Sequence, residues 1–473
     1  MKKRASHFSL DSATSGVPPL RSSAGLIVAA TVASGVLNYT YTLVLTRLLP
    51  TRSYSAFSSS LAILLVVGTV ANAAVPWTLA KELRGIGSGL AGRRSVSAGL
   101  ALNVLLGLIA AGACGLLAGR FLDKWSLIAL AVGAFGFFVA STGMGWALGR
   151  GRYRLLAVMI AGEVGVKAIV GILWVSNGGG MVGAIAAAAL GSLAVIIVSA
   201  FVMSEDRRLV RPGRHFGRIL RSSAGLSLLQ GLLVAAAVLD VVIVEVILPA
   251  APRVAAYQLA ATLGRAPIFL AMAITAVVFP TIVGGTANRK KDGTRVFEGL
   301  RLLLIMILPA WAILATIPRS IILSVAPSSY GEALHFLPVT AASGLLWTVV
   351  ILLSCCLGAA GRFRSAAVTV VGCGALGVIA MAVAGPVFGV WGFAVSELLT
   401  ALASLIGVTI LSRRQWGTDS TGGMVKNLAW LLSVVPLALL RDLPILWVLG
   451  ASITGILCLV VSFPAIRPGL LQQ

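Results

Sequence analysis

The feature that most constrains the fold of this chain is a series of long apolar runs separated by short polar loops. Most of the runs reach about 20 residues, the length that an α-helix needs to cross the hydrocarbon core of a bilayer. Only 11% of the 473 residues are charged and 58% are hydrophobic, whereas a soluble domain carries about 25% charged residues. The sequence therefore predicts an all-α polytopic membrane protein.

Fourteen apolar runs can be delimited, and they predict about 14 transmembrane helices. They lie at residues 24–46, 54–80, 96–118, 126–148, 155–176, 181–203, 222–247, 256–283, 300–322, 332–360, 365–385, 389–411, 427–440 and 444–465. The short segment "RDLP" joins the last two runs, and the sequence leaves open whether both of them span the bilayer fully.

The basic residues predict the orientation of the chain. Alternate loops place 28 of the 37 Lys and Arg residues on the side of the N-terminus and seven on the opposite side, with two inside the runs. Cytoplasmic loops carry such an excess, so we expect a multi-pass protein of the cell inner (cytoplasmic) membrane with both termini in the cytoplasm. Because the charges lie in short loops, anionic membrane lipids are the expected partner of the net charge of +23, and nucleic acid is not.

The short loops also argue against an enzyme. No loop is long enough to hold an extramembrane catalytic domain, as a membrane glycosyltransferase or polysaccharide polymerase would need, and the chain lacks a GxxxxGK[ST] phosphate-binding loop. The five cysteines lie inside apolar runs and form no CxxC pair, so we expect neither a disulfide framework nor a metal site. We expect a non-enzymatic membrane protein without a cofactor.

Two segments indicate an internal repeat. "LLP" at residues 48–50 follows the first run and "ILP" at residues 247–249 follows the seventh, and each precedes a basic residue and an aromatic residue, Phe57 or Tyr257. An offset of six helices keeps the topology, so the halves would be parallel repeats. The predicted domains are a disordered cytoplasmic tail at 1–23, six-helix bundles at 24–203 and 222–411, a basic cytoplasmic linker at 204–221 and an additional helix pair at 427–465.

The same segments carry a resemblance to a known family. "RLLPTRSYSAF" at residues 47–57 is similar to the pattern R-L-L-[GP]-x-x-x-[FY]-[GS]-x-[FY] of bacterial polysaccharide flippases, whose superfamily also contains multidrug and toxin extrusion transporters and lipid II flippases. In the second half, Asp240, Tyr257 and the Phe-Pro pair at 279–280 stand where this family has an Asp, a Tyr and a Phe-Pro. Ser55 departs from the glycine that is common there. The resemblance covers the first twelve helices and implies two bundles around a cavity that opens alternately to each side.

The resemblance implies a polyprenyl-diphosphate-linked oligosaccharide, or another cell-envelope glycan precursor, as the substrate. A diphosphate that crosses a low-dielectric core needs fixed cations, and arginine binds phosphate through its planar fork. The candidate substrate-binding residues are Arg47, Arg52, Lys167 and Arg265. The embedded acids, which are candidates for coupling or for structure, are Glu163, Asp240, Glu245 and Glu397. Coupling to H⁺ or Na⁺ and contacts with glycan-assembly enzymes stay open.

The embedded ions have structural alternatives. Arg265 is expected about 14 Å from the outer end of its helix, where it could read the diphosphate in the cavity or form a strut with Asp240 or Glu397. Asp240 could hold a coupling ion or anchor its own helix to a neighbour. Glu163 and Lys167 share one helix face at i,i+4, so they could simply neutralise each other.

The two arginines at the predicted outer mouth are similarly ambiguous. Arg47 and Arg52 bracket a turn that a proline terminates. They could contact the diphosphate or headgroup on the release side, or they could lie at the interface as ordinary snorkelling residues.

The function expected from these observations is a flippase or exporter that translocates the lipid-linked glycan by alternating access. The first alternative is a cation-coupled multidrug or small-metabolite antiporter on the same fold. A 14-helix major-facilitator transporter is less favoured, because "GIGSGLAGRR" lacks the Asp-Arg pair of that family's GxxxDRxGRR loop motif.

Overall fold

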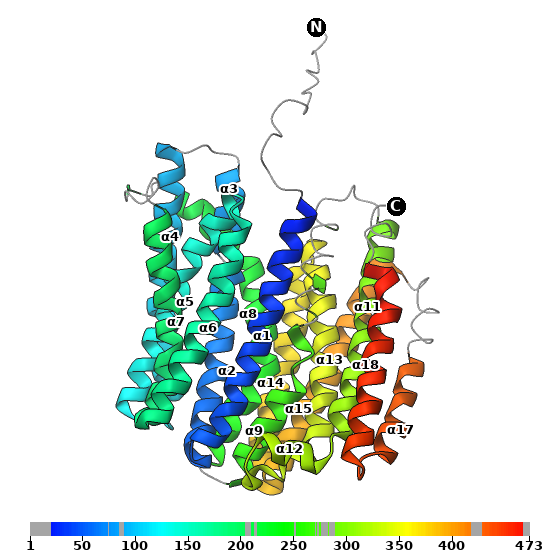
Figure 1. Cartoon of the computed structure of the whole chain (residues 1–473). Helices are drawn as coiled ribbons and strands as arrows, with labels where there is room; N and C mark the ends of the chain where they lie inside the picture. Colours follow the sequence, from blue (N-terminus) through cyan, green and yellow to red (C-terminus); the bar gives the residue numbers. More distant parts are fainter. Residues whose placement is uncertain are drawn as a thin grey trace.

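In the computed structural model the chain forms a bundle of long helices that run roughly side by side (Figure 1). The structure describes residues 20–466 except 74, 85–88, 204–209, 212–214, 250–251, 270, 272–273, 276–281, 283–288 and 418–427. Within these residues there is no strand, and ten stretches are long and apolar enough to cross a membrane. The predicted all-α membrane fold is confirmed, whereas the number of 14 spans stays a prediction.

The first helix group contains seven helices. They are α1 (Leu20–Leu48), α2 (Thr51–Ala73), α3 (Val75–Arg84), α4 (Leu90–Ala118), α5 (Lys124–Gly149), α6 (Tyr153–Trp174) and α7 (Gly180–Val202). Helix α5 packs against α4 and α7, and α6 packs against α1 and α7. The short π-helix η1 (Val175–Gly179) joins α6 to α7, and Gly178 there has φ 86°, which a residue with a Cβ rarely adopts. This kink lets the chain reverse between two antiparallel helices.

The second helix group follows the loop after α7. It contains α8 (His215–Ile247), α9 (Pro252–Gly264), α11 (Arg289–Thr316), α12 (Arg319–Val325), the 3₁₀ turn η2 (Ser328–Tyr330), α13 (Ala333–Ala359), α14 (Phe363–Phe388) and α15 (Val390–Trp416). The C-terminal segment adds η3 (Leu428–Ser433), α17 (Val434–Leu439) and α18 (Pro444–Ile466), which lie against α11. Helix α13 is the centre of this group, since it packs on α9, α11 and α15.

The two ends of the bundle can be told apart by the course of the chain. Helix α1 begins and α18 ends at one end, which we call the proximal end (Figure 1). The turns between α1 and α2 and between α8 and α9 lie at the opposite, distal end. Both Leu-Pro turns of the predicted repeat therefore lie at the same end, while the domain bounds and the cytoplasmic side stay predictions.

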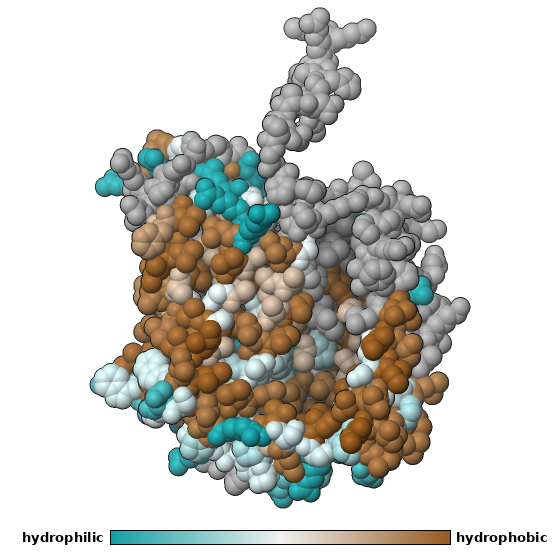
Figure 2. All heavy atoms as spheres, in the orientation of Figure 1, coloured by the Kyte–Doolittle hydropathy of each residue, from teal (hydrophilic) through white to brown (hydrophobic). Residues whose placement is uncertain are grey.

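The surface shows how the bundle meets its surroundings. A broad apolar belt lies between hydrophilic patches at the two ends of the molecule (Figure 2). Large apolar side chains are widely exposed along the helices, among them Leu116 (87% exposed), Phe201 (76%) and Ile445 (77%). A soluble monomer rarely exposes so continuous an apolar surface, so this belt is where lipid tails would lie.

Several helix bounds differ from the expected ones. The helix α8 begins at His215, within the range predicted as a linker, and α1 begins at Leu20, within the predicted tail. The helix α11 begins eleven residues before the predicted start at residue 300, because the charged segment at 289–299 extends the helix beyond the apolar run. The thirteenth predicted span is only η3 followed by the six-residue α17. Residues 210–211 of the predicted linker are described and are not helical, and the remainder of the predicted tail and linker lies outside the described residues.

Candidate functional site

A break in the helix that follows α8 places one cation inside the second group. Helix α9 ends at Gly264, well inside the run predicted as one span at 256–283. The chain tightens there, since the N–H of Ala266 donates to the carbonyl of Leu263 (3.1 Å) and that of Ile268 to Arg265 (3.0 Å). Pro267 has no N–H to continue the α-helical pattern. Irregular backbone at membrane depth occurs only where protein buries it or where it lines a cavity. Arg265 is the first residue of such an irregular segment.

A contact between two glycines fixes this break. An ideal Cβ on Gly344 of α13 would lie 2.1 Å from the carbonyl oxygen of Gly264, and a Cβ on Gly264 would lie 2.6 Å from the carbonyl carbon of Thr340. Only glycine allows the two backbones to approach this closely. The hydroxyl of Thr340 also donates to the carbonyl of Ala260 (3.0 Å). Helix α13 thereby holds the end of α9 and orients Arg265.

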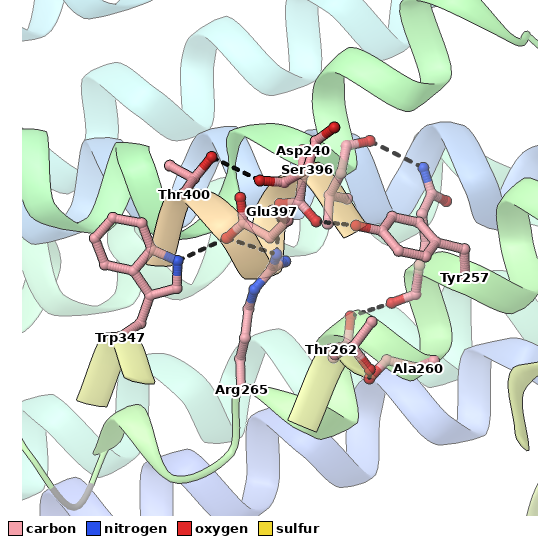
Figure 3. Close-up of polar contacts among 12 residues, drawn as sticks. Asp240, Tyr257, Ala260, Thr262, Arg265, Trp347, Ser396, Glu397 and Thr400 are labelled. Atoms are coloured by element: carbon pink, nitrogen blue, oxygen red, sulfur yellow. Dashed lines mark hydrogen bonds and ion pairs between the residues drawn. The ribbon is translucent and has the colours of Figure 1, made fainter. Parts of the chain in front are cut away.

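The guanidinium of Arg265 lies between two buried carboxylates (Figure 3). Its Nη2 is 2.5 Å from Oδ1 of Asp240 on α8 and 3.7 Å from Oε1 of Glu397 on α15. Asp240 is 0% exposed, Glu397 2% and Arg265 7%. Helices α8 and α15 and the turn after α9 therefore contribute one ion cluster.

Two aromatic side chains complete this ion cluster. The hydroxyl of Tyr257 donates to Asp240, and Nε1 of Trp347 donates to Oε1 of Glu397 at 2.7 Å (Figure 3). Nε of Arg265 and Oε2 of Glu397 have no hydrogen-bond partner among the described residues. One guanidinium facing two carboxylates leaves a formal excess of one negative charge when all three groups are ionised. Of the two alternatives for Arg265, a cation that reads the diphosphate or a strut between helices, this conformation has the strut. Both predicted acids, Asp240 and Glu397, are its partners.

The embedded lysine of the first group has a different environment. Lys167 on α6 is 8% exposed, donates from Nζ to Oδ1 of Asn38 on α1, and lies 5.4 Å from the ring centroid of Tyr41. The ion pairs among the described residues do not include Glu163, which is half-buried one turn away. Lys167 therefore joins α6 to α1 through an amide and an aromatic face.

The two helix groups meet at the distal end through a polar joint. Ser55 on α2 donates to the buried carboxylate of Glu245 on α8, and Ser59 one turn later donates to the carbonyl of Val241 (2.9 Å). Nε2 of Gln258 on α9 donates both to Ser59 (3.0 Å) and to the same carbonyl (3.1 Å). We call these five residues the distal joint. Ser59 and Gln258 follow the aromatic residues of the predicted repeat, Phe57 and Tyr257, so the corresponding segments of the two halves touch here.

A second contact across the groups involves the predicted arginine at the end of α1. Nε of Arg47 donates to the carbonyl of Val325 (2.8 Å), and its Nη2 donates to that of Ser324. These are terminal carbonyls of α12, which carry the negative end of a helix dipole. Tyr54 packs edge-on against Tyr330 beside this contact, with ring centroids 5.4 Å apart. Arg52 is exposed at the same end and has no ion pair among the described residues.

The structure thus separates the predicted site residues into three places. Asp240, Arg265 and Glu397 form the ion cluster, Glu245 belongs to the distal joint with Arg47 and Arg52 nearby, and Lys167 and Glu163 lie in the first group. Which of them bind substrate or a coupling ion stays a prediction. No group of three or more His, Cys, Asp or Glu within the described residues could hold a metal.

Sequence reasoning missed the uncharged partners of these ions. The segment "SYSAFSSSL" at residues 53–61 contains five serines, and Ser55 and Ser59 among them are four residues apart. That spacing places two hydroxyls on one helix face and could have predicted a polar contact. Nothing in the sequence distinguishes Asn38 or Trp347 as ion partners.

The fold was compared with known proteins. No family model and no curated protein matches the sequence. Among solved structures, the lipid II flippase MurJ in an inward closed conformation matches with a TM-score of 0.71 and 13% identity, over 93% of this chain and 100% of that chain. A multidrug resistance MATE family transporter of the MOP superfamily matches in its inward-facing conformation with a TM-score of 0.62 and 15% identity, over 83% and 98% of the two chains.

The outward-facing conformation of a MATE transporter matches with a TM-score of 0.59 and 16% identity, over 89% of this chain and 99% of that chain. The identities are low, so the likeness concerns the fold. The fold that the sequence resemblance implied is thereby confirmed. The helices described above adopt the membrane-transporter fold that the lipid II flippase and the MATE transporters share.

Proposed function

We propose that this protein is a flippase that moves a polyprenyl-diphosphate-linked glycan across the cytoplasmic membrane by alternating access. The observation that carries the proposal is the likeness of almost the whole chain to a lipid II flippase, with a higher TM-score and coverage than the MATE matches. The sequence pattern of residues 47–57, which resembles polysaccharide flippases, supports the same substrate class.

The distal joint supports an alternating mechanism. Under the orientation predicted by the basic loops, the distal end faces outward and is closed in this conformation by the contacts of α2 with α8 and α9. Opening this end requires Ser55 to leave Glu245 and Arg47 to leave the end of α12. These hydrogen bonds can re-form with water, and each, with one charged partner, contributes only about 1.5 to 3 kcal/mol net, so the joint can close and open without a large barrier.

Embedded charge supplies both binding and coupling in this proposal. Lys167 in the first group and Arg265 in the second are the cations available at membrane depth, and a diphosphate would replace the partners they hold in the closed conformation. If a coupling cation or proton is used, the excess negative charge of Asp240 and Glu397 around Arg265 is the place that would take it. Movement of Arg265 toward substrate would then depend on that cation.

A reconstituted system tests the proposal directly. Proteoliposomes with the purified chain would carry a fluorescent polyprenyl-diphosphate oligosaccharide, and a membrane-impermeant quencher would report the share of label in the outer leaflet. We expect the share of label that is protected from the quencher in the inner leaflet to fall faster than in protein-free vesicles. Ser55→Ala and Arg47→Gln should change the rate of this fall. A rate equal to that of empty vesicles would contradict the proposal.

The buried carboxylates Asp240 and Glu397 also suit a cation-coupled multidrug or small-metabolite antiporter, which is the second candidate. The same vesicles distinguish the two candidates. Uptake of a cationic dye driven by an H⁺ or Na⁺ gradient, without movement of the lipid-linked glycan, would favour the antiporter.

A further inference from the structure

The distal face of the second group contains a polar pocket of about 830 Å³, which neither the ion cluster nor the distal joint uses. Its wall is built from the starts of α9, α12 and α13, the η2 turn, and the turn between α17 and α18. Binding pockets for small ligands usually fall between about 300 and 1,000 Å³. The pocket is therefore large enough for a phosphate or diphosphate group and the atoms attached to it.

Three arginines line this pocket. Nε of Arg253 pairs with Oε2 of Glu332 at 3.0 Å. Arg319 and Arg441 are exposed at the pocket and have no carboxylate within ion-pair distance among the described residues. The only other acid among the lining residues is Asp442. Three guanidinium groups against two carboxylates leave a positive excess, and two of the three forks are available to a ligand.

The remaining lining groups fit the same ligand chemistry. Ser320, Ser328 and Ser329 contribute hydroxyls, and His335 lies in the first turn of α13. Helices α13 and α18 are 27 and 23 residues long, and both begin at the wall of the pocket. The positive ends of their dipoles favour an anion there. Arginine forks, hydroxyls and helix starts together are the donors that phosphate oxygens accept from.

The pocket is also connected to the contact between the two helix groups. Arg319 is the first residue of α12, and the last carbonyls of this seven-residue helix accept the hydrogen bonds of Arg47 from α1. A ligand held by Arg319 would therefore act on the helix that Arg47 joins to the first group.

We propose that this pocket is a binding site for a phosphate group, presented either as a free anion or as the headgroup of a phosphorylated lipid at the distal membrane surface. The site does not depend on the transport function proposed above, because binding there can be measured without any translocation.

Two probes distinguish the sources of the phosphate. The full chain in phosphatidylcholine nanodiscs is titrated with inorganic diphosphate by calorimetry, and nanodiscs that also contain phosphatidic acid are examined by native mass spectrometry for retained lipid. We expect saturable binding of at least one probe. Binding of diphosphate alone assigns the site to a free anion, and retention of phosphatidic acid alone assigns it to a lipid headgroup.

Variants tie the binding to the pocket. Arg319→Gln and Arg441→Gln should each weaken binding by about tenfold or more, the effect of losing one charge-assisted hydrogen bond. Arg120→Gln is the matched control, since it removes an exposed arginine in the turn between α4 and α5 of the first group and should leave binding unchanged. Absence of saturable binding of both probes, or binding that the two pocket variants leave as tight as before, would overturn the proposal. Unfolding midpoints of all variants verify that the fold is kept.

Discussion

Replacing Arg265 by methionine is the sharpest test of the ion cluster, because the substitution keeps a long side chain and removes only the charge and the hydrogen bonds. Asp240 and Glu397 would then lose the cation that lies 2.5 and 3.7 Å from their oxygens. At an effective dielectric constant of about 20, charges at those separations attract by about 7 and about 4 kcal/mol, respectively. Desolvation of the three groups offsets much of this attraction.

The net effect expected for Arg265→Met is a loss of about 3 to 5 kcal/mol of unfolding free energy, as for other buried pairs that lose one partner. The triple variant with Asp240→Asn, Arg265→Met and Glu397→Gln removes every charge of the cluster. It should recover most of the loss, because replacing a whole buried ion group is often close to neutral. The comparison separates the effect of an unpaired charge from that of lost packing.

Unfolding by dodecyl sulfate in mixed micelles provides the assay, with the fluorescence of the ten tryptophans as the signal. Trp347 donates directly to Glu397 and should report the cluster itself. Arg120→Met, an exposed arginine, should change the unfolding free energy by less than about 0.5 kcal/mol. A loss below about 1 kcal/mol for Arg265→Met, or a triple variant no more stable than the single one, would refute the assignment of a paired, buried cluster.

Three further predictions follow from other parts of the structure. Gly344→Ala would place a Cβ 2.1 Å from the carbonyl oxygen of Gly264, and we expect it to cost about 1 to 3 kcal/mol by overpacking, measured by the same unfolding assay. Ser55→Ala leaves the buried carboxylate of Glu245 without its donor, which should weaken closure of the distal end by about 1 to 3 kcal/mol and raise maleimide labelling of a cysteine placed in the joint. Asp123 caps α5 by accepting from the N–H groups of Trp125 (3.0 Å) and Ser126 (3.2 Å), so Asp123→Ala should cost about 0.5 to 2 kcal/mol in thermal or detergent unfolding.

Each of these variants has a matched control. Gly372→Ala in α14 adds a Cβ with no atom within 4 Å and should be neutral or stabilising by up to about 1 kcal/mol. An equal loss there would show that the glycine contact is not the cause. Thr69→Ala removes a hydroxyl that bonds only within α2 and should leave labelling of the joint unchanged. If it opens the joint as Ser55→Ala does, the role of Glu245 is wrong.

For the cap of α5, the control is a change of pH. Hydrogen bonds from the Ser126 hydroxyl, and then from backbone N–H groups, lower the pKa of the Asp123 carboxyl. A lowered pKa means that the stabilisation is present above the unfolded-state pKa and is lost as pH falls through the folded-state value. Asp123→Asn keeps a good capping residue without a titrating group, so its stability should not show this acidic loss. If the difference in unfolding free energy between the wild type and Asp123→Ala stayed unchanged at acidic pH, this explanation would be contradicted.

The sequence by itself determined that this chain is a stack of membrane-crossing helices. Backbone groups in lipid must be satisfied within the segment, so length and hydropathy of a run are sufficient to place a helix. The sequence also identified the three charged residues of the ion cluster, Asp240, Arg265 and Glu397. A charge inside an apolar run is energetically costly and therefore easy to recognise. The motif at residues 47–57 and its counterpart at Tyr257 predicted the fold that the lipid II flippase and the MATE transporter share.

Only the tertiary structure decided which of these charges meet. Helices that are apolar on every side give no pattern by which lipid-facing and buried faces can be separated. The sequence therefore could not decide whether Arg265 faces a substrate cavity or pairs with Asp240 or Glu397. The break of α9 at Gly264 and the close approach of Gly344 place Arg265 between Asp240 and Glu397. The helix ends likewise escaped prediction where polar segments continue a helix beyond the bilayer, as at the starts of α8 and α11. Which helices pack together is set by shape and by polar contacts between distant segments, and hydropathy along the chain contains neither.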